Sequence, residues 1–436
     1  MFLTGRAAIA IALGAVPVIA LNAAGVNAWG VFVVWLLLCG ALITLDVLLA
    51  VRPQVLQIER ELPVRVRLGQ QVTAKLRLIN LSERRVRARV RDGWQPTAGN
   101  EPSRLRVDVP AGESRAYRFA LHPRRRGELR TAFVAVRIAG PLGLAGRQRT
   151  LEAPDAIRVL PPFTSRRHLA SRVIRLRELD GNTSLQVRGQ GTEFDSLREY
   201  VRGDDVRSID WRATARSTNV MLRTWRPERD RHVVIVIDTG RTAAARVGDS
   251  TRLEASFESA LLLAALAHRA GDHVHLVAFD RVVRARVSGV DGPALVPALV
   301  DALAPVEAQL IDTDWDAALN QARRLWPHPS LLVLLTAQES LDASRGFLGV
   351  LPSVTGHGTV VIVGTATDGA LADAATSRGS TFDAYRAASA EASLAAASRV
   401  ARAIERAGAD AVTDTPEDLP PRIADRYLAL KKAGLL

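Results

Sequence analysis

The chain has 436 residues, of which 48% are hydrophobic and 5% aromatic, and its formal net charge is +13. This length predicts two or three domains and excludes a disulfide-stapled mini-protein. The one cysteine, Cys39, excludes an intrachain disulfide and a cysteine-based zinc site. Because 55 of the 58 basic residues are arginine, a single arginine says little about a binding site.

Residues 1–52 predict a transmembrane hairpin. Ala7–Ala24 contains no charged residue, and Trp29–Val51 contains one, Asp46. At 1.5 Å per residue the runs span about 27 and about 35 Å, close to a hydrocarbon core of about 30 Å. Basic residues flank the outer ends of both runs, at Arg6 and from Arg52 onward. The positive-inside rule therefore predicts a multi-pass protein of the bacterial cytoplasmic membrane, with the bulk of the chain in the cytoplasm.

Two alternatives to the hairpin stay open. The first run has the basic start and apolar centre of a signal peptide. If it is one, the second run would still stop translocation of the chain across the membrane. Both runs could instead be buried core helices. In the hairpin interpretation Asp46 is expected near the cytoplasmic interface, where a charge is often functional.

Residues 53–163 predict an antiparallel β-sandwich of immunoglobulin-like architecture. Apolar and basic residues alternate in Val64–Leu68, Lys75–Leu78 and Val86–Arg91, which is typical of strands with one buried and one wet face. Turn signals lie at residues 68–69, 91–93, 110–112 and 126–127. Short strands at such spacing favour a small sandwich.

Most of the excess positive charge lies in this β domain. Residues 53–163 hold 22 basic and 10 acidic residues, whereas residues 164–436 hold 34 of each. Anionic lipids of the inner leaflet attract such a segment. The alternative is that these arginines are solvated strand faces. Nucleic-acid binding is not expected, because no aromatic stacking series or helix-turn-helix accompanies the charge.

Residues 164–231 contain a string dense in both charge signs. Asp204, Asp205 and Asp210 alternate with arginines, which indicates arginine–carboxylate pairing. Nearby aromatic side chains, including Trp211, could anchor the string to a core. The same carboxylates could alternatively perform acid–base chemistry, for which one of them would need a raised pKa.

This string resembles the signature of a bacterial family known as domain of unknown function 58. The matching residues are Gly189, Gly191, Glu193, Phe194, Leu197, Arg198, Tyr200, Gly203, Asp204, Asp205, Arg207, Ile209, Asp210 and Trp211. The resemblance implies the layout of two membrane spans, a β domain and a C-terminal α/β domain. It also implies a partner, because proteins of this type commonly act beside MoxR-type AAA+ ATPases.

Residues 232–436 predict a doubly wound α/β domain that looks like a von Willebrand factor A fold. Buried strands are expected at His232–Asp238, His273–Phe279, Leu331–Leu335 and Thr359–Val363, with a strand at Val282–Val287. Helices are expected at Arg252–Ala270, Trp315–Trp326 and Ala390–Ala407, and a last helix after the N-cap Thr415. Asp238 then lies at the carboxyl edge of the sheet, where such folds bind ligands.

The A-type fold implies a Mg²⁺ site of oxygen ligands, which this sequence matches in part. Asp238, Thr242 and Thr313 fit, whereas Gly240 and Ala337 stand where oxygen ligands are expected. Asp314 or Glu339 could compensate. His273 and His275 share a strand face and could bind a metal, but no third ligand is evident, so a packed or surface pair is favoured.

These features favour a non-enzymatic, membrane-anchored adaptor that binds protein through the edge around Asp238, Gly240, Thr242, Thr313 and Asp314. No nucleophile elbow, phosphate loop or zinc-protease motif is present. The alternatives are an enzyme that uses the Asp/Arg-rich signature on an envelope precursor, and a structural scaffold bound to anionic lipid.

Overall fold

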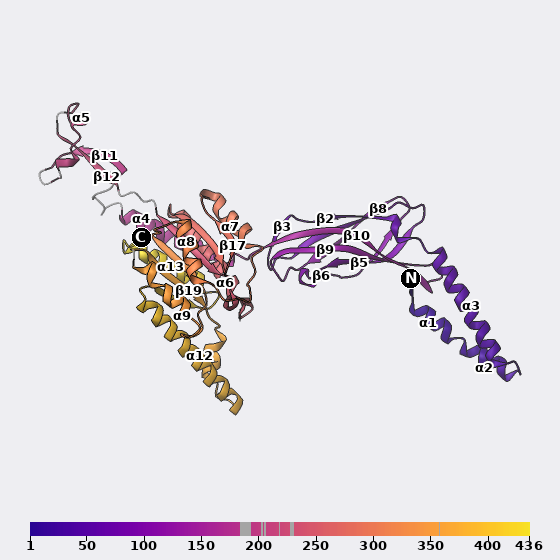
Figure 1. Cartoon of the computed structure of the whole chain (residues 1–436). Helices are drawn as coiled ribbons and strands as arrows, with labels where there is room; N and C mark the ends of the chain where they lie inside the picture. Colours follow the sequence, from indigo (N-terminus) through magenta and orange to yellow (C-terminus); the bar gives the residue numbers. More distant parts are fainter. Residues whose placement is uncertain (184–192, 202–203, 205, 218, 227–230, 357) are drawn as a thin grey trace. The chain divides into compact units, whose positions relative to one another are not determined.

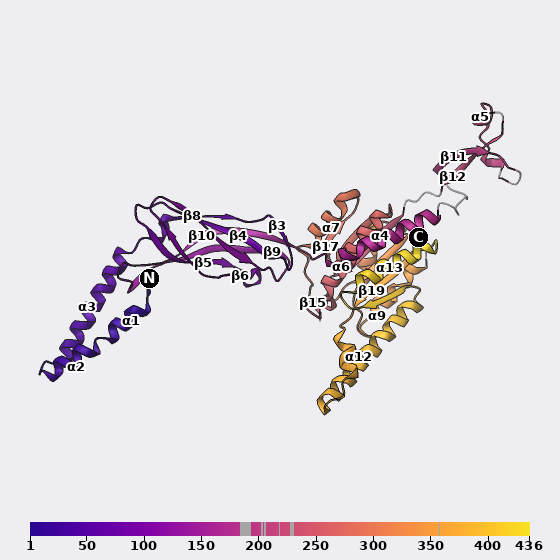
Figure 2. The ribbon, with the colours of Figure 1, turned by 180° about the vertical axis from the view of Figure 1, so that it is seen from behind.

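The computed structural model describes residues 1–183, 193–201, 204, 206–217, 219–226, 231–356 and 358–436. The chain forms two compact units, Met1–Leu160 and Pro161–Leu436. Figure 1 labels their helices and strands, and Figure 2 shows the same ribbon from behind.

The first unit begins with apolar helices, α1 (Gly5–Ala12), α2 (Ala15–Ala23) and α3 (Ala28–Leu49). The first apolar run is interrupted at Leu13 and Gly14, where the indole Nε1 of Trp35 donates to the carbonyl oxygen of Ala10 at 3.2 Å. Gly14 allows this approach, since a Cβ there would stand 2.2 Å from Trp35 Cδ1. By length and composition, residues 5–23 and 28–55 could each cross a membrane. Most of their side chains are exposed, so the alternative of two buried core helices is wrong.

Two sheets form the rest of this unit. One has the order β1-β10-β9-β5-β7 with β3 also paired to β10, and the other has the order β2-β4-β8-β6. All pairs are antiparallel except β3 with β10. The strands are β1 (Phe2–Leu3), β2 (Leu56–Glu61), β3 (Arg65–Arg67), β4 (Val72–Asn80), β5 (Val86–Trp94), β6 (Asn100–Glu101), β7 (Leu105–Val109), β8 (Ser114–Leu121), β9 (Gly127–Ala139) and β10 (Ala145–Leu160).

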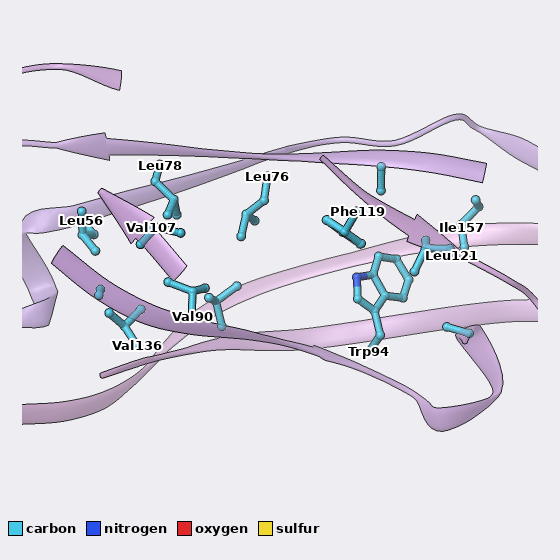
Figure 3. Packing of buried hydrophobic residues seen from close by; sticks show 14 of the residues in the cluster. Leu56, Leu76, Leu78, Val90, Trp94, Val107, Phe119, Leu121, Val136 and Ile157 are labelled. Carbon is cyan, nitrogen blue, oxygen red and sulfur yellow. The ribbon is translucent and has the colours of Figure 1, made fainter. Parts of the chain in front are cut away.

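The core of the β domain lies between the two sheets. Leu76 and Leu78 of β4 face Val90 and Val136 of the opposite sheet (Figure 3). Burial alternates along β4 and β5, as the period-two pattern predicts. The basic residues between the apolar ones therefore point away from this core.

The turn expected at residues 91–93 is wrong, because β5 continues to Trp94. Gly93 instead allows close approach of β9, since a Cβ there would stand 2.8 Å from the carbonyl oxygen of Phe133. Asp92 is buried and forms an ion pair with Arg60 at 2.7 Å. The other glycine turn signals are confirmed by positive φ at Gly69, Gly112 and Gly127.

The second unit contains a six-stranded sheet of order β17-β16-β13-β18-β19-β20, parallel except for β17. Its strands are β13 (His232–Asp238), β16 (His273–Phe279), β17 (Val283–Val287), β18 (Leu331–Leu335), β19 (Val360–Ala366) and β20 (Asp410–Asp414). A short pair, β14 (Arg246–Val247) and β15 (Ser250–Thr251), precedes the first long helix.

Helices cover both faces of this sheet, as Figures 1 and 2 show. One side carries α4 (Leu169–Thr183), α6 (Arg252–Arg269), α7 (Leu295–Leu303) and α13 (Leu419–Lys432). The other carries α8 (Trp315–Leu325), α9 (Arg345–Val350), α10 (Pro352–Thr355) and the C-terminal part of α12 (Thr381–Arg406). The short α11 (Ala370–Thr376) lies beside α12.

Two helix starts differ from the sequence-based expectation. Helix α12 begins at Thr381, nine residues before Ala390, because the hydroxyl of Ser380 accepts the backbone N–H of Asp383 at 3.2 Å. Helix α13 begins at Leu419, after the expected N-cap Thr415. Pro420 and Pro421 stand in its first turn, where the missing N–H costs no helical bond.

The signature segment forms a hairpin of β11 (Glu193–Glu199) and β12 (Met221–Arg226). Between these strands lie a 3₁₀ turn at Val206–Ser208 and the short helix α5 (Trp211–Thr214). Gly189, Gly191, Gly203 and Asp205 lie outside the described residues.

Candidate functional site

The site centres on Asp238, the last residue of β13, at the carboxyl edge of the parallel sheet. Its carboxylate is almost fully buried. Oδ1 accepts the hydroxyl of Thr313 at 2.5 Å and the backbone N–H of Gly240 at 2.8 Å. Oδ2 accepts the hydroxyls of Thr336 at 2.6 Å and Thr242 at 3.5 Å. Three loops that are distant in sequence therefore meet on one carboxylate.

Gly240 has a steric role in this cluster. A Cβ there would lie 2.3 Å from the hydroxyl oxygen of Thr313 and 2.9 Å from the carbonyl oxygen of Ile311. A serine at this position would push Thr313 away from Asp238. The glycine thus accompanies a direct Thr313–Asp238 bond, in place of the oxygen ligand that the A-type pattern has there.

Burial raises the pKa of Asp238 above its ordinary value, although the hydroxyls of Thr313 and Thr336 and the N–H of Gly240 act in the opposite direction. The raised pKa means that the folded protein favours the protonated carboxyl more than an unfolded chain does.

A pocket of about 220 Å³ opens beside Asp238. Trp315 and Phe347 contribute its aromatic wall, with their rings edge to face at a centroid distance of 4.7 Å. Arg241 pairs with Asp312 at 3.1 Å, and Arg252 pairs with Glu339 at 2.8 Å. Asp312 and Glu339 line the pocket as well, so both charge signs stand at its edge.

The donor set is a poor fit for the magnesium site that the sequence suggests. Asp238 is the carboxylate at its centre, and Ala337 provides no oxygen from its side chain. Glu339 is paired with Arg252, and Asp314 caps α8 by accepting the N–H of Ala317 at 3.0 Å. Among the described residues, no group of three or more His, Cys, Asp and Glu side chains could hold a metal ion. The magnesium site stays a prediction.

Asp280 is a second buried carboxylate at this edge, and the sequence analysis missed it. It directly follows β16, whereas Asp238 is the last residue of β13, and this position after a buried strand is the signal that could have found it. Its carboxylate accepts Arg284 Nε at 2.6 Å and the hydroxyl of Thr239 at 3.0 Å. Burial by itself would raise the pKa of Asp280, but Arg284 and nearby backbone N–H groups hold the pKa below its ordinary value. Its carbonyl oxygen also accepts the N–H of Asp314 at 2.8 Å, which positions the loop that carries Thr313.

Two carboxylates of the signature, Asp204 and Asp210, are paired with arginine. Asp204 bonds Arg198 at 2.7 Å, and Asp210 bonds Arg223 at 2.7 Å. Asp210 also caps α5 by accepting the N–H groups of Arg212 and Ala213. The pKa of Asp204 is lowered chiefly by Arg198, and the pKa of Asp210 by the Ala213 N–H and then Arg223. Lowered values argue against either group as the general acid of an enzyme.

Other signature residues have local structural roles or none that the contacts reveal. The N–H of Tyr200 donates to the carbonyl oxygen of Val220 at 2.8 Å, which extends the hairpin. Trp211 does not anchor the segment, because 69% of its surface is exposed. Glu193 and Phe194 pair through the backbone with Arg226 and Trp225. Arg207 lies in the 3₁₀ turn.

The histidines lie at the opposite, amino edge of the sheet. His232 Nδ1 and His275 Nε2 are 2.9 Å apart, and His273 Nδ1 lies 2.8 Å from Asp291. The ring of His232 stacks on Trp326 at a centroid distance of 3.4 Å. Burial and the neighbouring histidines lower the pKa of His275. This geometry is that of a packed aromatic cluster.

The second unit is thus an α/β domain with a polar cluster and pocket at the carboxyl edge of a mostly parallel sheet. Residues 196–364 match a family model described as "Protein of unknown function DUF58". This match confirms the resemblance of the signature to that family. A comparison with curated proteins gives no match.

Solved structures match about a quarter of the chain. A complex of zinc 2-glycoprotein and prolactin-inducible protein from human seminal plasma matches at 13% identity and TM-score 0.20, over 25% of this chain and 96% of that one. The CARDB domain of a Pyrococcus furiosus protein matches at 15% identity and TM-score 0.18, over 24% and 94%. A FixG-related protein from Vibrio parahaemolyticus matches at 13% identity and TM-score 0.17, over 25% and 98%. Similarity this low carries no argument about function.

Proposed function

We propose that this protein is a membrane-anchored adaptor that binds other proteins through the carboxyl edge of its α/β domain. The apolar helices α1, α2 and α3 are the proposed anchor, since they expose apolar side chains along their length. Basic residues at the outer ends of the hairpin support a cytoplasmic location for the rest of the chain.

The finer fold assignments belong to this proposal. A strand order of β17-β16-β13-β18-β19-β20, with Asp238, Thr242 and Thr313 at one edge, supports a von Willebrand factor A-like domain. Two facing, mainly antiparallel sheets over a shared core support an immunoglobulin-like β domain.

The observation that carries the adaptor proposal is the combination of a closed carboxylate cluster and an open pocket. Both carboxylate oxygens of Asp238 accept hydrogen bonds from its own chain. Asp238 therefore holds the loops together and is not positioned to attack or protonate a substrate. The largely buried Trp315 and Phe347 line part of the adjoining pocket, and the exposed ion pair of Arg241 with Asp312 lies at its edge. Such a surface suits a protein loop that carries an apolar side chain flanked by charges.

The proposed partner is a MoxR-type AAA+ ATPase, which would remodel or activate client complexes in the envelope. This choice follows from the family resemblance of the signature. The client stays unspecified, because neither the pocket nor the signature distinguishes one protein from another.

Capture from detergent-solubilised membranes tests this function. We expect the intact chain to retain a MoxR-type ATPase encoded beside its own gene. Arg241→Ala should weaken that retention at least about tenfold, as expected for an arginine near the centre of an interface. Arg378→Ala is the matched control, because Arg378 also forms an exposed ion pair, with Glu391, but lies outside the pocket. Failure of capture both with and without ATP and Mg²⁺, or equal losses in the two variants, would overturn the proposal.

A further inference from the structure

One turn of the β domain, residues 140–145 between β9 and β10, meets both ends of the membrane hairpin. Strand β1 pairs with Ala145 and Gly146, and the N–H of Thr4 donates to the carbonyl oxygen of Leu144 at 2.9 Å, just before α1. Asp46, in the last turn of α3, accepts the N–H groups of Leu142, Leu144 and Ala145 at 2.7 to 2.8 Å. The first helix therefore starts, and the last helix ends, at the level of this turn.

Arginine side chains lie around the turn at residues 140–145 and the C-terminal end of α3. Arg147 donates to the carbonyl oxygens of Val47 at 2.9 Å and Leu48 at 3.4 Å, and Arg84 donates to that of Leu49 at 3.3 Å. These are carbonyls of the last turn of α3, which contains no basic residue of its own. The exposed Arg6 lies over the turn, since a Cβ on Gly143 would stand 3.0 Å from its guanidinium. Each guanidinium has five N–H donors, more than these bonds use.

Two acidic groups near these arginines are already bound to other partners. Asp46 is fully buried and bound by backbone N–H groups. Asp108 neutralises the adjacent Arg85 through a 2.6 Å ion pair, so Arg85 does not add to the positive charge around this turn. Apolar side chains are exposed at the same level, among them Leu3, Leu48 and Leu142. Exposed leucines next to arginines match the boundary between hydrocarbon and headgroups, where long basic side chains reach toward phosphate.

We infer that this end of the β domain is a binding site for the headgroup phosphates of anionic phospholipid, formed by Arg6, Arg84 and Arg147. The inference rests on the membrane anchor of the proposed function, and it identifies the lipid class that the anchor selects. Arg84 and Arg147 would bind phosphate while they cap α3, so lipid binding and attachment of the β domain to the hairpin share the same side chains. Arginine suits this dual role because its planar fork can bond a carbonyl and a phosphate together.

The test uses the full chain in nanodiscs made from an equal mixture of phosphatidylcholine and phosphatidylglycerol. Native mass spectrometry of the released protein counts the lipids of each class that stay bound. We expect preferential retention of phosphatidylglycerol, reduced about fivefold for each arginine removed in Arg6→Gln and Arg84→Gln. Arg6→Gln removes no helix-capping bond, so its effect is not a consequence of a frayed α3.

The matched control is the double variant Arg104→Gln and Arg124→Gln, which removes two exposed arginines from the same domain. Arg124 precedes the opposite end of β9, about 40 Å from the turn at 140–145 for a strand of that length. Its lipid retention should equal that of the unmodified chain. Equal losses in the control and test variants would overturn the headgroup site.

Two further outcomes separate the inference from the proposal on which it rests. A chain that enters nanodiscs but retains both lipids equally would overturn the headgroup site and leave the anchor standing. A chain that stays monodisperse without detergent and enters no bilayer would overturn both. A last comparison uses soluble glycerol phosphate and measures the thermal stability of the protein. If glycerol phosphate stabilises the protein as much as nanodiscs that contain phosphatidylglycerol, the site binds free phosphate and the lipid inference is overturned.

Discussion

Asp46 and Asp238 are both buried carboxylates whose oxygens are occupied by their own chain, yet their surroundings differ. Asp46 binds three backbone N–H groups of a single turn. Asp238 binds hydroxyls and one N–H from three separate loops, and a pocket opens beside it. The comparison teaches that burial of a carboxylate does not define a functional site. The type of hydrogen-bond donor and the presence of a pocket beside the carboxylate distinguish a purely structural carboxylate, such as Asp46, from one at a candidate binding edge, such as Asp238.

Asp46→Ala should have the largest effect on stability. It leaves one buried and two partly buried N–H groups without an acceptor and detaches α3 from the β domain, so we expect a loss of about 4 kcal/mol. Thermal unfolding in detergent and limited proteolysis between residues 49 and 56 measure it. Asp155→Ala, at a β10 carboxylate that bonds the adjacent Ala156 N–H, is the control with little expected effect. Equal proteolysis of the two variants would show that Asp46 does not attach α3 to the β domain.

Asp238→Ala should cost about 3 kcal/mol, because Thr313, Thr336 and the N–H of Gly240 lose their acceptor. Asp238→Asn should cost less and should depend on pH. Since the pKa of Asp238 is raised on folding, the unmodified protein loses stability as pH rises from about 4, the ordinary value for Asp, toward the folded pKa. Asparagine does not titrate, so the cost of Asp238→Asn should shrink over that window. A cost that grew with pH would show that Asp238 is held as a charged ligand.

Arg284→Gln should show the opposite pH dependence. The pKa of Asp280 is lowered on folding, so its contribution is present above about pH 4 and is lost as pH falls through the folded pKa. Without Arg284 the buried carboxylate loses its charged partner, and we expect a cost of about 2 kcal/mol near neutral pH that nearly vanishes in acid. Denaturant unfolding at a series of pH values measures this cost. A pH-independent cost would mean that Arg284 stabilises the fold by packing.

Arg241→Ala should have the smallest effect on stability, at most about 0.5 kcal/mol, because its ion pair with Asp312 is exposed. The same variant is expected to weaken partner capture strongly. A melting temperature unchanged from that of the control variant Arg378→Ala would confirm that the edge residue serves binding. A large loss of stability would instead make Arg241 a structural residue.

The sequence predicted the parallel strands well, because continuous apolar runs such as His232–Asp238 have few alternatives to a buried strand. It also placed Thr313 beside Asp238 through the A-type metal-site pattern. It missed Asp280, whose partner Arg284 lies on the next strand of a hairpin, and it did not foresee that Asp46 binds a turn almost one hundred residues away. Both depend on tertiary pairing that local patterns do not encode. The misplaced turn at Gly93 has the same origin, since the close contact with Phe133 comes from another strand.

Protease treatment of intact spheroplasts tests the central claim most directly, because the adaptor and the lipid site both require the bulk of the chain to lie inside the cell. With a tag at Leu436, we expect the full-length chain to survive the protease in intact spheroplasts and to be digested after lysis. Digestion of the second unit in intact spheroplasts, with a cytoplasmic marker still protected, would contradict the account.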